Sequence, residues 1–319
     1  MIPTGVMTGD REDVAGPADR DSAAPLDDAA AREFERHRPR LLGIAYRLLG
    51  SMWDAEDVVT EALLRWARTD RAAVHEPAAY LTTVVSRLAL DQLRSARATR
   101  ETYVGPWLPE PALTDGGALG PLDTVERRES VSLATLHLLE RLTPPERAVF
   151  VLREVFDVPY DHVAAALDVT EAGARQLLRR ARQRIGGEAR RFPPDDEEHE
   201  RLFERFLRAF ATGDLDELRD VLAADAVAYT DGGGQVRAAR RPVVGADAIV
   251  RFAADLRRRF AVEDVRRVEA NGQPAAVLRV GDLRQVLAVD VRDGRIQAVY
   301  GIANPDKLRY ALDQLARSA

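Results

Sequence analysis

Apolar residues recur every three or four positions along much of the chain before residue 192, which predicts a series of amphipathic helices. The pattern from Ala31 to Arg68 breaks once, at Gly50-Ser51, where Ser51 is placed to cap a second helix. A third helix begins at Glu76-Pro77, because proline is tolerated in a first helical turn. Together with the periodic stretch from Val131 to Arg191, these helices predict two all-α domains.

Residues 102–131 interrupt the helical pattern. Prolines and glycines recur throughout this segment and prevent regular structure. The string Trp107–Pro111 should be extended, because a residue that precedes proline is pushed out of the helical region. A tryptophan and aliphatic residues in such a linker indicate that it docks on another surface.

Beyond residue 200 the pattern changes to two helices and a series of short apolar runs. The helix Gly245–Phe260 stands among these runs, and turn sequences occur at Asp231–Gly234 and Asp293-Gly294. Strands are expected at Val227–Thr230, Val236–Ala239, Ala275–Val280, Val286–Val291 and Ile296–Ile302. Helices followed by strands predict an α+β domain with a curved antiparallel sheet.

The charge distribution changes this picture more than the total does. The formal net charge of −6 argues against a nucleic-acid partner. However, residues 1–30 hold seven acidic residues and two arginines and lack periodicity, which predicts a disordered acidic tail. Residues 171–191 instead hold seven arginines and two glutamates, and an acidic connector follows at 192–200. The total therefore conceals one strongly basic segment.

That basic segment contains a predicted helix-turn-helix. A short helix from His162 to Leu167 meets a turn at Asp168–Thr170, and a longer helix begins at Glu171. We expect its first exposed residues to meet base edges and its later ones to meet phosphates. The base set is Glu171, Arg175, Gln176 and Arg179, and the phosphate set is Arg180, Arg182 and Arg184. A solvated arginine-rich helix is the alternative. The basic Tyr80–Arg100 helix fits contact with DNA backbone or splayed bases and an ordinary surface helix equally well.

The sequence contains few residues that indicate a catalytic site. The chain has no cysteine, which excludes disulfides and thiolate sites, and residues 200–319 contain no histidine. Asp231, Asp290 and Tyr229 could act as acids or bases, but turn and strand-end aspartates are more often structural. The acids Asp54, Glu56 and Asp57 fit stabilisation of a helix start better than an acid/base or metal site, and a docking surface is a third interpretation. We therefore expect no enzyme activity, no metal and no cofactor.

Three parts of the chain resemble the bacterial extracytoplasmic-function (ECF) sigma factors of RNA polymerase. The matching strings are Asp54–Glu61 continuing to Trp66, Tyr80–Arg94, and Leu142–Arg147 leading into the helix-turn-helix. Three further strings resemble the subgroup of these sigma factors that carries a SnoaL-like C-terminal extension. They are Trp107–Pro111, Asp231–Val236 and Asn304–Leu308.

The resemblance implies a domain plan and a partner for each part. It places a region 2 domain at 31–101, a linker at 102–131, a region 4 domain at 132–191 and a regulatory SnoaL-like domain at 201–319. The implied partners are promoter DNA and the RNA polymerase core, through its β′ clamp helices and β flap. Core binding would use Asp54, Glu56, Asp57, Glu61 and Trp66, and the minus-ten element would meet Arg87, Asp91, Arg94 and Arg97. The helix from Glu171 to Arg184 would read the minus-thirty-five element.

The regulatory domain would contact the sigma domains within the same chain. The residues implied are Trp107, Pro109, Glu110, Asp231, Gly232, Gly233, Gly234, Asn304, Pro305, Asp306, Lys307 and Leu308. Four positions depart from the family pattern: Asp168 replaces glycine, Leu177 replaces arginine, Arg87 replaces asparagine and Gln235 replaces lysine.

Two other functions stay open at this point: a helix-turn-helix regulator with a ligand-sensing C-terminal domain, and an enzyme fused to a DNA-binding module. No apolar run approaches the ~18 residues of a membrane span. Residues 1–30 contain no stretch of signal-peptide type. We therefore expect a cytoplasmic protein without membrane contact.

Overall fold

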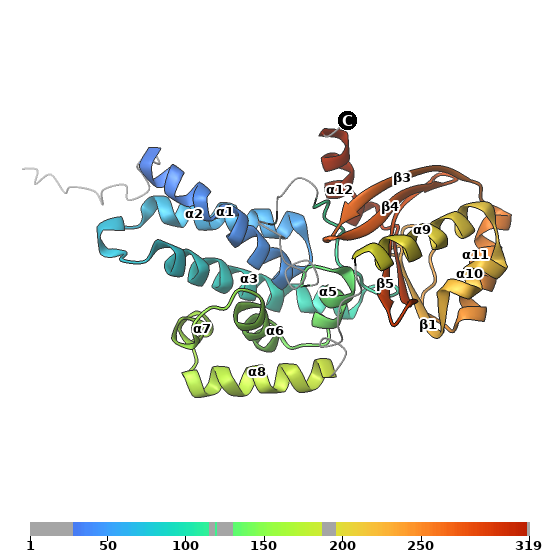
Figure 1. Cartoon of the computed structure of the whole chain (residues 1–319). Helices are drawn as coiled ribbons and strands as arrows, with labels where there is room; N and C mark the ends of the chain where they lie inside the picture. Colours follow the sequence, from blue (N-terminus) through green and yellow to red (C-terminus); the bar gives the residue numbers. More distant parts are fainter. Residues whose placement is uncertain (1–27, 115–118, 120–129, 187–195, 318–319) are drawn as a thin grey trace, which may run out of the picture.

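The first helical domain is a three-helix unit whose boundaries follow local sequence signals. The computed structural model describes residues 28–317 apart from 115–118, 120–129 and 187–195 (Figure 1). The Ser51 hydroxyl accepts a hydrogen bond from the Asp54 amide and caps the second helix, as its position predicts. The elements are α1 (Asp28–Leu49), α2 (Met52–Arg68), a 3₁₀ turn (Arg71–Ala73) and α3 (Pro77–Glu101).

The predicted acidic tail is too long by three residues. Residues 1–27 lie outside the described part of the chain, but α1 begins at Asp28. Ala30 is 1% exposed and its carbonyl accepts a hydrogen bond from Trp66 Nε1 (3.1 Å). Residues 28–30 of the predicted tail are therefore helical, because they pack against α2.

The second helical domain contains the helix-turn-helix. Thr143 and Glu146 form a reciprocal capping box before α6. Asp168 adopts a left-handed conformation (φ 55°) between α7 and α8, so an aspartate does here what glycine does in the related motif. The elements are α5 (Leu133–Leu139), α6 (Pro144–Phe150), a π-helical turn (Val151–Val155), α7 (Tyr160–Leu167) and α8 (Glu171–Ile185).

The two helical domains share one hydrophobic core. Apolar residues of α1, α2 and α3 belong to the same buried cluster as those of α6, α7 and α8. The contact runs along α3, which packs against α6 and α7. Arg87 on α3 donates a hydrogen bond to the Ala165 carbonyl on α7 (2.6 Å). The DNA-binding candidates on α3 and α8 are thus held in one body.

The C-terminal domain is a six-stranded sheet with helices on both faces. Its strand order is β2-β1-β6-β5-β4-β3. The helices are α9 (Asp196–Thr212), α10 (Leu215–Val221), α11 (Ala246–Arg259) and α12 (Pro305–Arg317). The strands are β1 (Leu222–Asp231), β2 (Val243–Val244), β3 (Val262–Ala270), β4 (Gln273–Val280), β5 (Leu283–Arg292) and β6 (Arg295–Ile302).

The α+β prediction is confirmed, and four details of it are corrected. The sheet is mixed rather than antiparallel, because β1 pairs in parallel with β6. Val236–Ala239 is not a strand, although hydrogen bonds join Ala239 to Thr230 of β1. Strand β3 was not predicted, because its charged residues are exposed and break the alternation. The acidic connector ends early, since Asp196 already begins α9 and acids favour a helix N-terminus.

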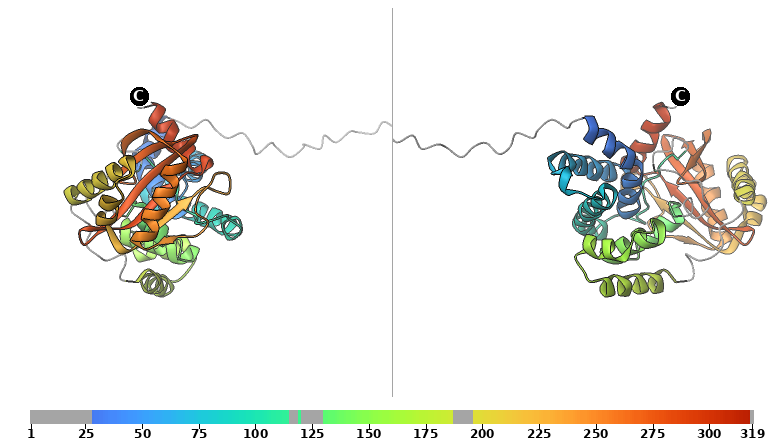
Figure 2. Two further views of the ribbon diagram at one scale, coloured as in Figure 1. Left: turned by 90° about the vertical axis from the view of Figure 1, so that its right-hand side faces the viewer. Right: turned by 60° about the vertical axis from the view of Figure 1, so that its left-hand side comes forward.

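The sheet separates two cores. Helices α9, α10 and α11 cover one face. The other face packs on the linker, α5 and α12, through a cluster that includes Leu108, Leu133 and Leu308. Figure 2 shows α12 beside the N-terminal helices at the edge of the sheet. The linker and α12 therefore lie between the sigma-like helices and the C-terminal domain.

Candidate functional site

Helix α8 displays every residue predicted to meet the minus-thirty-five element. Each of these seven side chains is exposed, while Ala174, Leu178, Ala181 and Ile185 face the core. At 3.6 residues per turn, Gln176, Arg179 and Arg180 lie opposite the buried face. Gln183 is also exposed and lies seven residues after Gln176, hence on the same stripe. The sequence prediction missed Gln183, although its spacing could have indicated it.

The arginines at the edges of α8 are engaged by neighbouring acids. Arg175 pairs with Glu171 (2.8 Å), and Arg182 pairs with Glu154 (2.6 Å). Arg184 pairs with Glu146 (3.2 Å), whose side chain is only 3% exposed. These ion pairs hold the edge arginines in place and would compete with phosphate.

The α3 candidates lie along the junction of the two helical domains. Arg87 is bonded to α7, as described above. Arg94 lies near Asp91 (3.4 Å), in an exposed pair. Arg97 lies on α3, but its side chain is outside the described part of the chain. In this arrangement the Arg87 guanidinium is hydrogen-bonded to α7 and is not available to DNA through that group.

Helix α2 carries the core-binding candidates, and one of them is misassigned. Trp66 is 2% exposed and packs against Tyr80 with ring centroids 5.8 Å apart, so it stabilises the domain and is not presented to another protein. Asp57 is exposed, Asp54 is half-buried, and Glu61 pairs with Arg65 on the surface (2.9 Å). The apolar periodicity of α2 already placed Trp66 on its inner face.

Helix α12 covers part of α2. Tyr310 Oη donates a hydrogen bond to Glu56 (3.2 Å), which also pairs with Arg38. The Tyr310 ring packs edge-on against Trp53 with centroids 5.5 Å apart. The Arg309 guanidinium carbon lies over the Trp53 ring, 5.7 Å from its centroid. Glu56 is therefore occupied by the C-terminal helix, a contact that sequence reasoning did not predict.

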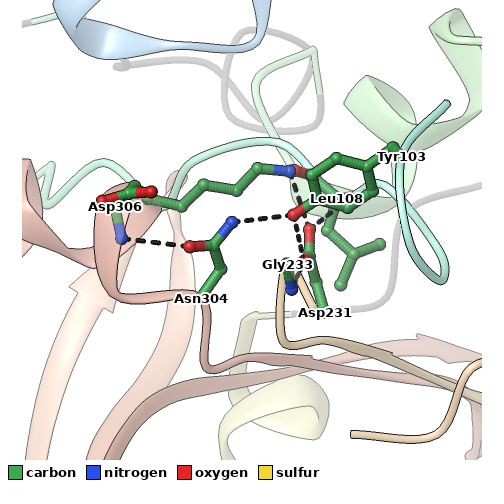
Figure 3. A network of polar contacts seen from close by, with 7 residues as sticks. Tyr103, Leu108, Asp231, Gly233, Asn304 and Asp306 are labelled. Atoms are coloured by element: carbon green, nitrogen blue, oxygen red, sulfur yellow. Dashed lines mark hydrogen bonds and ion pairs between the residues drawn. The ribbon is translucent and has the colours of Figure 1, made fainter. Parts of the chain in front are cut away.

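The three subgroup strings meet in one buried polar network around Asp231 (Figure 3). The Asp231 side chain is 0% exposed and pairs with Lys307 Nζ (2.7 Å). Its carboxylate also accepts hydrogen bonds from Tyr103 Oη (2.5 Å), the Leu108 amide (2.9 Å) and the Gly233 amide (3.0 Å). Four donors from three separate segments therefore converge on one carboxylate.

Lys307 is the cation of this network. Its Nζ donates to the Leu108 carbonyl (2.6 Å) and lies 3.9 Å from the centroid of the Trp107 ring. Asn304 joins the network by donating from Nδ2 to Tyr103 Oη (2.8 Å). Gly233 (φ 60°) leaves room for Asn304, since an added Cβ would lie 2.3 Å from Asn304 Nδ2. Of the other implied residues, Gly232 and Leu308 are buried, Gly234 packs near Val104, Pro109 lies in the buried linker, and Pro305 and Asp306 open α12.

A second set of contacts fixes the rest of the linker. Glu110 accepts a hydrogen bond from the Met52 amide (2.8 Å), which ties the linker to the start of α2. Asn271 donates to Tyr46 Oη (2.6 Å) and to the Val131 carbonyl (2.9 Å). Gln314 on α12 exchanges two hydrogen bonds with the backbone of Leu113. Asn271 and Gln314 were not predicted, because neither stands in a motif.

Burial shifts the pKa values of several groups at this interface. It raises the pKa of Glu110, and it raises that of Tyr103, where the hydrogen bond to Asp231 adds to the effect. Burial lowers the pKa of His137, which packs against the Tyr229 ring with centroids 4.7 Å apart. Tyr103 and His137 are therefore favoured in their neutral forms.

The acid and base candidates of the C-terminal domain are engaged in structural contacts. Asp231 lies in the network, Asp290 pairs with Arg292 (3.0 Å), and Tyr229 stacks on Tyr300. Within the described ranges, no group of three or more His, Asp or Glu side chains could hold a metal ion. None of the described helices is long and apolar enough to cross a membrane.

Family models match all three parts of the chain. The Sigma-70 region 2 model matches residues 34–99, the Sigma-70 region 4 model matches residues 132–185, and the SnoaL-like domain model matches residues 203–299. A two-domain helical body with a helix-turn-helix, joined to a SnoaL-like domain, defines a sigma factor with a C-terminal extension.

Comparison with individual relatives identifies the family to which the chain belongs. The chain is 42% identical to the ECF RNA polymerase sigma factor SigJ of Mycobacterium tuberculosis over 86% of its own length and 92% of that protein. It is 32% identical to the probable ECF sigma factor SigI of the same species, over 88% and 95% of the two chains. The crystal structure of M. tuberculosis SigJ matches with a TM-score of 0.73 and 37% identity, over 88% of this chain and 98% of that one. The chain therefore belongs to the ECF family of RNA polymerase sigma factors, and it directs promoter-specific transcription initiation.

Proposed function

We propose that this sigma factor is autoinhibited, and that its SnoaL-like domain restrains it through the linker and α12. The observation that carries the proposal is the position of α12, which engages Glu56 and Trp53 on the helix expected to bind the polymerase core. A clamp helix of the polymerase and α12 would compete for this face of α2.

The packing of the two helical domains supports the same proposal. Promoter elements named for positions minus ten and minus thirty-five lie roughly 85 Å apart along B-DNA, at about 3.4 Å per base pair. Here α3 and α7 are joined by a hydrogen bond of 2.6 Å between Arg87 and Ala165. One molecule reading both elements must therefore separate α3 from α7. The linker, which packs against the sheet and α12, would have to leave this position in the same change.

We assign the DNA contacts by geometry on α8. Gln176, Arg179, Arg180 and Gln183 form the outward stripe, and the edge arginines would meet phosphates after exchanging their acidic partners. On α3, Arg87 becomes available only when the helical domains part. We further propose that the SnoaL-like domain has no catalytic role, since Asp231, its most buried acid, is saturated by four donors.

Run-off transcription with purified polymerase core tests this proposal. The full chain and a chain that ends at residue 303, which lacks α12, are compared on promoters upstream of the protein's own and neighbouring genes. We expect the shorter chain to bind core more tightly and to give more transcript. A matched control, Arg317→Ala, changes the exposed end of α12 and should behave like the full chain.

Equal core binding by the two chains would refute autoinhibition by α12. Tight duplex binding without core would instead favour the helix-turn-helix regulator. A complete absence of core binding by every chain would refute the assignment of α2.

A further inference from the structure

Strand β3 is an edge strand of the six-stranded sheet. The strand order β2-β1-β6-β5-β4-β3 places it at one end, with β4 as its neighbour. Figure 1 shows β3 along the upper margin of the C-terminal domain, whereas α8 lies at the lower margin of the helical body. An edge strand presents backbone N–H and C=O groups that can pair with another chain. The outer edge of β3 is therefore a candidate interaction surface.

The hydrogen bonds at the end of β3 fix which backbone groups face outward. The Glu269 carbonyl points away from β4, because it accepts a hydrogen bond from the Thr114 amide of the linker (3.1 Å). Outward and inward groups alternate along an antiparallel strand, and the pairing with β4 is regular from Asp264 onward. The backbone groups of Val265 and Arg267 therefore also point outward.

Most of this edge stays exposed. Leu113 of the linker bridges to Ala270 at the end of β3. The linker then leaves the sheet, since a Cβ added at Gly43 of α1 would lie 2.9 Å from the Leu119 carbonyl oxygen. Residues 263–267 are all exposed, so none of the segments that the structure describes covers them.

The charges on this exposed stretch are ordered by sign. Two acidic residues precede a valine and two arginines follow it, in the order Glu263, Asp264, Val265, Arg266 and Arg267. If two copies pair in antiparallel fashion about Val265, position 264 lies opposite position 266 of the second copy, and 263 lies opposite 267. Each charged pair then joins an acid to an arginine, whereas a parallel pair would oppose like charges.

Asp264 and Arg266 are the pair available for such contacts. Both are exposed, and within the described ranges neither side chain has an ion-pair partner. Because Val265 and Arg267 supply the outward hydrogen-bonding groups, positions 264 and 266 are non-hydrogen-bonded positions. Opposed side chains come closest at such positions. Two copies would thus gain two close ion pairs, one on each side of the two-fold axis.

The two outer charges contribute less to pairing. Glu263 pairs with Arg279 of β4, and Arg267 pairs with two glutamates of α9. Glu263 is also an extra residue in the register between β3 and β4, and such a bulge bends the start of a strand. The contacts between Asp264 and Arg266 should therefore decide association.

We propose that β3 is a self-association surface, through which two copies of this chain pair their C-terminal sheets in antiparallel fashion about Val265. Charged edge strands usually prevent pairing with other chains. The sign order of β3 makes its own copy the exception. One short strand pair buries well under the roughly 1,200 Å² below which complexes are weak and transient, so we expect a dissociation constant in the micromolar range. This proposal does not rest on the proposed autoinhibition.

Sedimentation velocity of the full chain at low salt, across the micromolar range, tests the dimer. Arg266→Asp places acids opposite acids in both central pairs, and Asp264→Arg places arginines opposite arginines. We expect each variant alone to weaken dimerisation by about tenfold or more. Arg284→Asp changes an exposed arginine of β5, which lies inside the sheet, and this matched control should dimerise like the parent.

Mixing the two edge variants separates pairing from a folding defect. Their heterodimer again opposes acids to arginines, so an equimolar mixture of Arg266→Asp and Asp264→Arg should dimerise as tightly as the parent. Failure of the mixture to form a heterodimer would refute the proposal. A parent chain that stays monomeric up to submillimolar concentration would also refute it, as would equal dimerisation by the parent and both edge variants.

Val265→Pro tests the backbone pairing itself. Proline removes the outward N–H at the two-fold axis, and an edge strand tolerates this where the N–H faces solvent. The variant should keep the circular dichroism spectrum of the parent and lose the dimer. A dimer that persists in this variant would show that association uses another surface.

Discussion

Replacing Asp231 with asparagine removes the charge at the centre of the domain interface while keeping the size of the side chain. The carboxylate is 0% exposed and receives its four donors from the linker, the glycine turn and α12. An amide retains one acceptor oxygen, but it turns two N–H donors toward groups that are themselves donors. Lys307 would then be a buried cation without a counter-charge.

The size of the effect follows from that burial. Removing one member of a buried ion pair typically costs ~3–5 kcal/mol, and ~1.4 kcal/mol corresponds to a factor of ten. Lys307 retains the Leu108 carbonyl and the Trp107 ring, so we expect the lower end of this range. The opening equilibrium of the interface should rise by roughly two orders of magnitude.

Native-state hydrogen exchange of the Leu108 amide measures this equilibrium. Lys307→Met should have a smaller effect, because Asp231 keeps three donors. The double variant should lose ~0.5–3 kcal/mol less interface stability than the sum of the losses in the two single variants. Asp216→Asn is the control, since its side chain is 97% exposed, and it should stay within ~0.5 kcal/mol of the parent. Unchanged Leu108 exchange in Asp231→Asn, or strictly additive single variants, would show that the network does not hold the linker.

Other variants probe separate parts of the molecule. Burial raises the pKa of Glu110 above its ordinary value of 4.5, so its contribution to stability falls as pH rises through that window. Glu110→Gln should therefore gain in urea stability over the parent as pH rises above 4.5, and parallel profiles would contradict this. His137 has a lowered pKa, so acidification below its ordinary value of 6.5 should destabilise the parent. In thermal melts recorded at decreasing pH, His137→Gln should therefore lose less stability on acidification than the parent. In holoenzyme–promoter titrations, replacing the edge arginine Arg182 with alanine should reduce the slope of log binding constant against log salt concentration by about 0.9, without changing sequence preference. Gln176→Ala should instead relax discrimination by ~1–3 kcal/mol at one base pair, and an equal loss on every sequence would remove it from the base-reading set.

The locally encoded features were predictable. Ser51, Thr143 and Asp168 act through caps and a left-handed turn that depend on a few neighbouring residues, and each adopts the expected conformation. The three subgroup strings were expected to take part in regulatory contacts, and the structure brings all three together around Lys307 and Asp231. Their chemistry is visible in sequence because a lone lysine, an aspartate before three glycines and an extended aromatic linker are each unusual.

Features that depend on distant contacts were not predictable. Strand β3 has an exposed, charged sequence and is a strand because β4 offers it an edge. Trp66 was assigned to a partner, although its place on the inner face of α2 fills the core. Asn271 and Gln314 reach the linker across more than 150 residues of sequence, where only the complete fold brings donors to acceptors. The contact of Tyr310 with α2 is of the same kind.

The shared core of the two helical domains has a consequence for how affinity should be understood. If the form that binds core must first separate α3 from α7, then the measured dissociation constant is the intrinsic one divided by the fraction of molecules already open. An opening free energy of about 2.8 kcal/mol would leave roughly 1% of molecules competent and weaken apparent binding about a hundredfold. A substitution at the α3–α7 junction, such as one at Arg87, could thus strengthen holoenzyme assembly without touching any surface that meets the polymerase. The strength of an internal contact would set the threshold at which this sigma factor competes for the polymerase core.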